Sequence, residues 1–264
     1  KMYNFDVERP ATIADAVQMM TREEAQPMSG GQTLIPTLKA RLAAPSVLVS
    51  LTGIDEMKGV CVDDAGRLCI GGATTHADVM REAAGHYPAL AGLAARIGDP
   101  AVRNRGTIGG SIANNDPSAC YPAGALGSGA TIVTNSREIA ADDYFQGMFE
   151  TALEEGEIVT EVKFPIPQAA HYEKFLQPAS RFPLVAAYVA KFADGVRVAI
   201  TGASNNGVFR WAEAEAALSA NFSADALAGL SVDGTDMIND LHGTSAYRAH
   251  LVAVMTKRAV AAIG

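Results

Sequence analysis

A glycine pair beside small polar residues is the first feature of this sequence that could do chemistry. It lies just after a short apolar segment, in the run Ser29-Gly30-Gly31-Gln32-Thr33. Glycine lets a backbone approach a ligand closely and adopt positive φ. Leu34, Leu38 and Leu42 follow at helical spacing, with Pro36 in the first turn. Unpaired amides at such a helix start could bind a phosphate, although a tight turn is the commoner role of a glycine pair.

A second glycine pair changes this interpretation. It stands among small hydroxyl residues in the run Thr107-Ile108-Gly109-Gly110-Ser111. Two such corners could each supply amide donors to one phosphate of a pyrophosphate. Neither run fits the G-x-G-x-x-G pattern of dinucleotide-binding folds or the G-x-x-x-x-G-K-[ST] pattern of P-loops. The sequence therefore predicts a diphosphate site built in another way.

Together the two runs resemble the FAD loops of the flavoprotein (medium) subunits of molybdenum hydroxylases, the xanthine dehydrogenase and aerobic carbon monoxide dehydrogenase family. The likeness is greatest to the carbon monoxide dehydrogenase medium chains, and it covers essentially the whole chain. It includes the opening Tyr3-Asn4-Phe5, the helix start Pro10-Ala11-Thr12 and the strand exit Glu161-Val162-Lys163-Phe164-Pro165. The resemblance implies an α+β fold. A vanillyl-alcohol-oxidase-type (PCMH-type) FAD domain of two α/β subdomains would precede a small C-terminal α+β domain with an antiparallel sheet and helices.

The resemblance also implies which residues contact a non-covalent FAD. Beside the diphosphate and ribityl chain it places the two glycine runs, namely Ser29, Gly30, Gly31, Gln32, Thr33 and Leu34, and Thr107, Ile108, Gly109, Gly110 and Ser111. Ile97 would lie beside the cofactor, and Ile158 or Val159 near the adenine. Residues 181–185 would lie near the flavin ring. Many relatives carry an acidic residue where this chain has Cys120, and Asp116 is a possible substitute.

The implied function is electron transfer within a larger enzyme. In this family a large molybdopterin subunit oxidises the substrate, and a small subunit with two [2Fe–2S] clusters passes the electrons to FAD. FAD then reduces an external acceptor, and such three-subunit complexes can be dimerised. This chain would hold only the FAD, with no catalytic acid or base and no metal. A self-contained flavin oxidase or dehydrogenase is the alternative, and a non-catalytic nucleotide-binding module is a third reading.

The elements that must position these residues can be read from the sequence pattern. The first part of the chain predicts a β-α-β-α-β unit. It contains a strand over 3–7, a helix capped at Thr12, the first glycine run with its helix, and a strand over 47–49. We further expect a hairpin over 61–70, strands over 131–133 and 157–164, a hairpin around 194–195, and helices from 75, over 88–97, 122–129, 211–218, 223–230 and 245–263. The prolines of 165–167 suggest a boundary between an FAD-binding domain, 1–167 (subdomains about 1–55 and 56–167), and a C-terminal domain, 168–264.

Composition excludes several other classes of protein. The formal net charge of −8 argues against binding to a nucleic-acid backbone, which depends on clustered Lys and Arg. Cys61, Cys69 and Cys120 form no C-x-x-C motif, so neither a disulfide framework nor a metal cluster is expected. The five histidines form no H-E-x-x-H motif. Without a candidate base nearby in sequence, Cys120 is best interpreted as a small buried residue. No signal peptide or membrane span is visible, which favours a cytoplasmic protein.

Overall fold

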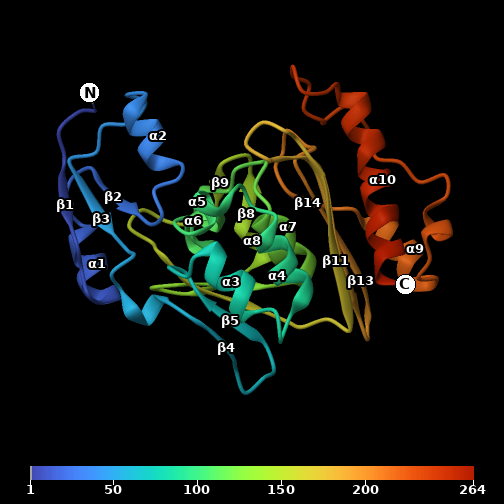
Figure 1. Cartoon of the computed structure of the whole chain (residues 1–264), viewed down its shortest axis with the longest axis horizontal. Helices are drawn as coiled ribbons and strands as arrows, with labels where there is room; N and C mark the ends of the chain where they lie inside the picture. The colour runs from blue at the N-terminus through green and yellow to red at the C-terminus, as the bar shows by residue number, and fades with distance from the viewer. Residues whose placement is uncertain (1) are drawn as a thin grey trace.

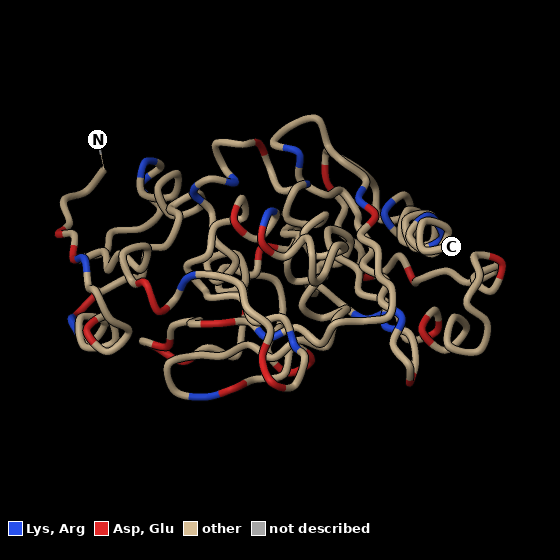
Figure 2. Tube along the Cα trace, turned by 60° about the horizontal axis from the view of Figure 1, so that its bottom comes forward, with Lys and Arg blue, Asp and Glu red and all other residues tan. Residues whose placement is uncertain are grey.

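Three β-sheets of three or more strands follow one another along the chain in the computed structural model, which describes residues 2–264, and a two-stranded hairpin accompanies the second. Figure 1 shows them spread from the N-terminal unit on the left to the C-terminal unit on the right, with helices packed on each. The mixture of helices and strands agrees with the expected α+β class. Figure 2 shows basic and acidic residues interspersed along the trace.

The first sheet is small and parallel, with strand order β1-β3-β2. Its elements are β1 (Asp6–Glu8), α1 (Ile13–Met19), β2 (Ala25–Met28), α2 (Leu34–Lys39) and β3 (Val47–Ser50). Thr12 caps α1 by accepting a hydrogen bond from the Asp15 amide. All four residues of β3 are buried, as their continuous apolar pattern predicts. The β-α-β-α-β prediction is confirmed.

Two boundaries in this unit differ from the predictions. The first strand begins at Asp6, not at residue 3. The helix after the first glycine run ends at Lys39, because Arg41 adopts φ +60° and turns the chain away. Leu38 is buried, but Leu42 lies beyond the helix and is 79% exposed. The expected apolar face therefore stops one turn early.

The second sheet is antiparallel, with strand order β4-β5-β10-β6-β7. Its strands are β4 (Val60–Val62), β5 (Leu68–Gly71), β6 (Thr131–Thr134), β7 (Glu138–Ala140) and β10 (Val159–Phe164). Around it lie η1 (Asp55–Met57), α3 (His76–Glu82), α4 (Pro88–Ala95), α5 (Pro100–Arg103), α6 (Ile108–Asn114), α7 (Tyr121–Ser128), α8 (Ala141–Tyr144) and the hairpin of β8 (Phe145–Gly147) and β9 (Glu150–Thr151). The predicted 61–70 hairpin is confirmed, with Cys61 opposite Cys69 and both thiols free.

The third sheet, β11-β12-β13-β14, is antiparallel and packs against helices on both faces. Its elements are β11 (Ala169–Leu176), β12 (Pro183–Phe192), β13 (Gly195–Thr201), β14 (Phe209–Arg210), α9 (Ala212–Ala220), η2 (Ala224–Leu227) and α10 (Ser245–Ile263). The hairpin around Gly195 and the long last helix are confirmed. The helix expected over 223–230 is wrong, because that segment forms only the short 3-10 turn η2.

The core does not stop where the second sheet ends. The linker between Phe164 and Ala169 carries the prolines that suggested a domain boundary, and this boundary stays a prediction. One hydrophobic cluster contains Leu90 and Tyr121 from before the linker together with Tyr188 from after it. A Cβ added to Gly127 of α7 would lie 2.8 Å from the Tyr188 ring, so only glycine permits this helix to pack so closely.

Neither a membrane span nor a metal cluster is found in the part of the chain that the structure describes, residues 2–264. Within it, no helix is both long and apolar enough to cross a bilayer. Within the same residues, no group of three or more His, Cys, Asp or Glu side chains could hold a metal ion.

Candidate cofactor-binding site

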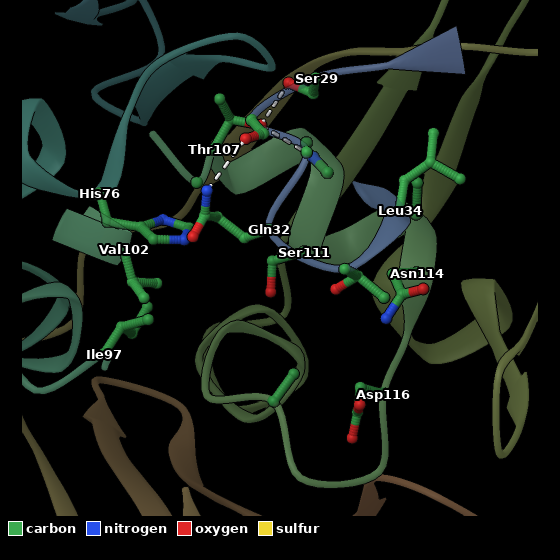
Figure 3. Close-up of a pocket in the computed structure, with 18 of the residues that line it drawn as sticks. Ser29, Gln32, Leu34, His76, Ile97, Val102, Thr107, Ser111, Asn114 and Asp116 are labelled. Atoms are coloured by element: carbon green, nitrogen blue, oxygen red, sulfur yellow. Dashed lines mark hydrogen bonds between the residues drawn. The ribbon is translucent and has the colours of Figure 1, made fainter. Parts of the chain in front are cut away.

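A cavity of about 740 Å³ lies where the first sheet meets the second, with the third sheet closing one end. Such a volume is typical of a pocket for a cofactor or another small molecule. Every residue of the two glycine runs lines it, except Ile108, which is fully buried in the core. The other predicted contact residues also line it, namely Ile97, Asp116, Cys120, Ile158 and Val159. Of residues 181–185, which the resemblance placed near the flavin ring, Arg181, Phe182 and Pro183 line the cavity, and Leu184 and Val185 do not. Figure 3 shows Leu34 and Asp116 on one side of the cavity and His76 and Ile97 on the other.

The loop between β2 and α2 has free backbone donors. Among residues 2–264, none of the N–H groups from Ser29 to Thr33 donates a hydrogen bond. Gly31 adopts φ +70°, and its carbonyl accepts from Ile35 as α2 begins. The five residues that carry these donors line the cavity, and unengaged backbone donors are what a site for phosphate oxygens needs.

The second glycine run differs from the expected corner, because Gly109 and Gly110 lie in the first turn of α6. Thr107 caps this helix by accepting from the Gly110 amide at 3.2 Å. The other amides of the turn are also engaged: Ile108 donates to the Thr74 carbonyl, Gly109 to that of Gly72, and Ser111 to that of Thr107. The four amides from Ile108 to Ser111 are thus satisfied inside the protein. Because these amides are engaged, this run contributes side chains to the cavity, among them Ser111 in Figure 3.

The two runs touch each other directly. A Cβ added to Gly30 would lie 2.0 Å from the Arg105 carbonyl oxygen, and one added to Gly109 would lie 2.6 Å from that of Gly72. Ser29 Oγ and Thr107 Oγ1 are joined by a hydrogen bond of 2.6 Å, drawn in Figure 3. Gly30 and Gly109 therefore permit close approach between protein backbones, a reason that the sequence alone did not reveal.

His76 is a cavity residue that sequence reasoning missed. Its side chain is 5% exposed, and its Nδ1 has no hydrogen-bond partner in residues 2–264. Burial, with a smaller contribution from the Arg103 cation, lowers the pKa of His76 to about 4. The imidazole is therefore neutral at physiological pH. The only available sequence signal was its place beside Thr75, the cap of α3.

A second missed residue is Lys174, and it lies against Cys120. The Cys120 side chain is 5% exposed, so its interpretation as a small buried residue is confirmed. The Lys174 ammonium donates to Cys120 Sγ at 3.5 Å, and the lysine residue as a whole is only 4% exposed. Burial lowers the pKa of Lys174. The signal was present in β11, where Tyr172 and Lys174 occupy alternate positions and both face inward.

Two cations hold the segment that carries Ile97. The Lys174 ammonium donates to the Arg96 carbonyl at 2.8 Å, and the Arg96 guanidinium donates back to the Lys174 carbonyl at 3.0 Å. Arg103 donates to the carbonyls of Ile97 and Gly98, each at 3.1 Å. Three successive carbonyl oxygens are thereby fixed, which keeps the Ile97 side chain in place at the cavity wall.

The cavity wall at Ile158 and Val159, where the adenine is predicted, is fixed by the neighbouring Glu157 carboxylate. The Glu157 side chain is 3% exposed and accepts from the Arg137 guanidinium, Thr134 Oγ1 and the Glu154 amide. These donors, Arg137 first, lower the pKa of Glu157 to about 2. The Ile158 amide donates to the Asn135 side chain at 2.7 Å, so this wall is also fixed.

Asp116 reaches the cavity from the segment after α6. One of its carboxylate oxygens accepts from the Ser118 amide at 2.8 Å. Asn114, which sequence reasoning did not single out, lies on the same side of the cavity in Figure 3. These two side chains are available to the hydroxyl groups of a ligand, and the predicted role of Asp116 as a substitute for Cys120 stays a prediction.

A family model for the FAD binding domain in molybdopterin dehydrogenase matches residues 3–167. The chain belongs to this family. It is accordingly an FAD-binding subunit of an oxidoreductase, and the expected fold class is confirmed. The five free amides of the first loop fit the diphosphate of FAD, because phosphate oxygens accept hydrogen bonds from consecutive backbone N–H groups.

Relatives match over nearly their whole length. The carbon monoxide dehydrogenase medium chain of Afipia carboxidovorans is 34% identical over 97% of this chain and 96% of its own. The nicotine 6-hydroxylase medium subunit of Paenarthrobacter nicotinovorans is 32% identical over 97% and 95%.

Solved structures of the family give the same result. A chain of the reconstituted CO dehydrogenase from Oligotropha carboxidovorans superposes with a TM-score of 0.90 at 31% identity, covering 100% of this chain and 98% of that one. A chain of quinoline 2-oxidoreductase from Pseudomonas putida 86 gives a TM-score of 0.88 at 28% identity, with the same coverage.

Proposed function

We propose that this chain is the FAD-carrying electron-transfer subunit of a three-subunit molybdenum hydroxylase. A small subunit with [2Fe–2S] clusters would supply electrons that a large molybdopterin subunit takes from the substrate. FAD would then pass the electrons to an external acceptor. The observation that carries the proposal is a row of five cavity-lining residues with free backbone amides, in a chain of this family.

The chain's own residues would bind and orient the cofactor. The loop from Ser29 to Thr33 would hold the diphosphate, and Ile97 and Ile158 would contact its two ends. FAD supplies the redox chemistry when bound, and the protein supplies binding, orientation and electrostatics. Two titratable groups are built into the cavity wall, since Glu157 is engaged by Arg137 and His76 is held neutral by burial. This arrangement suits a subunit that needs no acid–base residue of its own.

Cofactor choice tests the first half of the proposal. FAD should bind to the purified chain without a covalent link, and FMN should replace it poorly because FMN lacks the diphosphate. Binding of both flavins can be followed by the quenching of their fluorescence. Equal affinity for FMN and FAD would contradict the assignment of the first loop to the diphosphate.

Reconstitution tests the second half. The chain should be co-expressed with its small and large partner subunits, with each partner left out in turn. Anaerobic addition of the large subunit's substrate should bleach the flavin only when both partners are present, while dithionite should bleach it in every sample. Flavin reduction by that substrate with this chain alone would favour a self-contained oxidase or dehydrogenase and overturn the proposal.

A further inference from the structure

The buried lysine of β11 carries a charge that the protein does not balance. Among residues 2–264, Lys174 takes part in no ion pair, and its side chain is 4% exposed. Its ammonium has three N–H donors, and two are used, by the Arg96 carbonyl at 2.8 Å and by Cys120 Sγ at 3.5 Å. A buried charge without a counter-ion is costly. Its place on the cavity wall suggests that a ligand supplies the missing negative charge.

Lys174 lies at one particular end of the cavity. Its two hydrogen-bond partners place it beside Cys120 and beside the segment of Ile97, which is bonded to Arg96. Residues 180–183 also line the cavity, and Pro183 pairs with Leu176 of β11, two residues from Lys174, so this segment lies at the same end. Ile158 and Glu157 belong to another part of the wall, on the strand side of the first sheet. The resemblance places residues 181–185 near the flavin ring and Ile158 near the adenine, so under the proposed function the Lys174 end would hold the isoalloxazine ring.

We propose that the Lys174 ammonium stabilises the negative charge that the isoalloxazine ring gains when bound FAD is reduced. The inference rests on the proposed function. When bound, the neutral ring would take two electrons from the iron–sulfur partner and one proton from solvent water, which gives an anionic reduced ring. No bond to Lys174 forms or breaks, and the lysine proton stays on Nζ. The ammonium acts only by its charge.

The expected effect follows from differential binding. A fixed cation in a site that excludes water interacts more strongly with the anionic ring than with the neutral ring. Removing the cation should therefore weaken reduced FAD more than oxidised FAD. A tenfold loss of this preference would lower the two-electron midpoint potential by about 30 mV.

The decisive variant is Lys174→Gln, because its amide can still donate to the Arg96 carbonyl and keep the Ile97 segment in place. Lys174→Arg keeps the charge. Lys191→Met is a matched control, since Lys191 lies on β12 with its ammonium 4.8 Å from the Phe222 ring and outside the cavity. The midpoint potential of bound FAD should be measured by spectroelectrochemistry at full occupancy. The midpoint potential of FAD in K174Q should be lower than in the wild type by about 30 mV. The midpoint potentials in K174R and K191M should stay near the wild-type value.

Affinity for ADP separates the ring from the diphosphate. ADP has the diphosphate but no isoalloxazine, so calorimetry should give the same affinity for wild type and K174Q. A loss of ADP affinity in K174Q would place the ammonium at the diphosphate and overturn the assignment.

Cys120→Ala tests whether a thiolate already neutralises Lys174. C120A should keep the wild-type potential, and a tenfold gain in preference for reduced FAD would overturn the proposal.

The two levels of inference fail in different ways. A wild-type chain that binds no FAD would overturn the proposed function. A K174Q chain that is fully loaded with FAD at the wild-type potential would overturn only the role of Lys174. If K174Q did not fold, Lys174→Met would be measured with the same readouts, because both variants remove the charge.

Discussion

The loop after β2 and the start of α6 both carry a glycine pair beside serine and threonine, yet they use their backbone amides differently. The five amides from Ser29 to Thr33 have no partner in residues 2–264, and their residues line the cavity. The four from Ile108 to Ser111 are all bonded inside the protein. The first run is therefore suited to binding a ligand. The second run is suited to supporting the first run through the hydrogen bond between Ser29 and Thr107. Similar sequence runs can thus divide between binding and support, and their neighbours decide which role each takes.

The largest expected effect tests the supporting role of the second run. In Gly109→Ala the new Cβ would lie 2.6 Å from the Gly72 carbonyl oxygen, and backbone cannot move aside as a side chain can. We expect the FAD-free protein to lose about 3 kcal/mol of unfolding free energy, or to fail to fold. Urea unfolding of the FAD-free protein measures this loss.

Gly110→Ala is the matched control for that variant. Its Cβ would meet Thr107 Oγ1 at 3.0 Å and Ser29 Cβ at 3.4 Å, which are side-chain atoms that can shift. Its loss should be clearly smaller than that of G109A. Equal urea midpoints for the two variants would remove the structural distinction between the neighbouring glycines.

A smaller effect is expected where the two runs meet. Thr107→Val removes the cap on the Gly110 amide and the hydrogen bond to Ser29. A lost cap typically costs about 1 kcal/mol and a lost hydrogen bond about as much, so the FAD-free protein should lose roughly 2 kcal/mol. FAD affinity should fall as well, because Ser29 opens the first loop.

Thr12→Val gives the comparison for that effect. Thr12 caps α1 outside the cavity, so this variant should lose only about 1 kcal/mol of stability and keep its FAD affinity. Thermal unfolding and flavin titration of both variants provide the measurements. Unchanged FAD affinity in T107V would show that the contact between the runs does not support the binding loop.

The smallest effect concerns a cavity residue that, like the second run, is engaged within the protein. The pKa of Glu157 is lowered to about 2 in the folded chain from 4.5, so its stabilisation is complete above about pH 4.5 and is lost as the pH falls toward 2. Glu157→Gln should cost about 1 kcal/mol at neutral pH and remove this part of the acid dependence. Urea unfolding at several pH values from 2 to 6 tests it. A wild-type slope that persists in the variant would assign the acid dependence to other carboxylates.

Local sequence signals predicted the elements whose pattern needs no distant partner. The cap at Thr12, the apolar run of β3 and the turn before Gly195 all appear where expected. The α6 helix was not predicted, because two glycines disfavour a helix, and the close contact with Gly72 that accounts for Gly109 is visible only in the structure. The early end of α2 at Lys39 was equally invisible, since nothing local identifies Arg41 as a left-handed residue.

The sequence predicted the site residues that belong to a motif but not those that reach the cavity from elsewhere in the chain. Residues within the two glycine runs could be transferred by motif, and all of them except Ile108 line the cavity. Lys174 and His76 could not, because they come to the cavity from β11 and α3, far from either run in sequence. Which of two inward-facing residues on a strand reaches a ligand depends on tertiary packing, and no motif records that packing.

The core that continues past Pro167 bears on how freely this chain could be recombined. A fragment ending at the linker would lose Tyr188, which packs against α7, and Lys174, whose ammonium holds the Arg96 carbonyl. Its newly bare apolar surface would favour aggregation over folding. The segment that matches the FAD-binding family is therefore not a portable module, and a chimera between two relatives should exchange the third sheet together with α4 and α7.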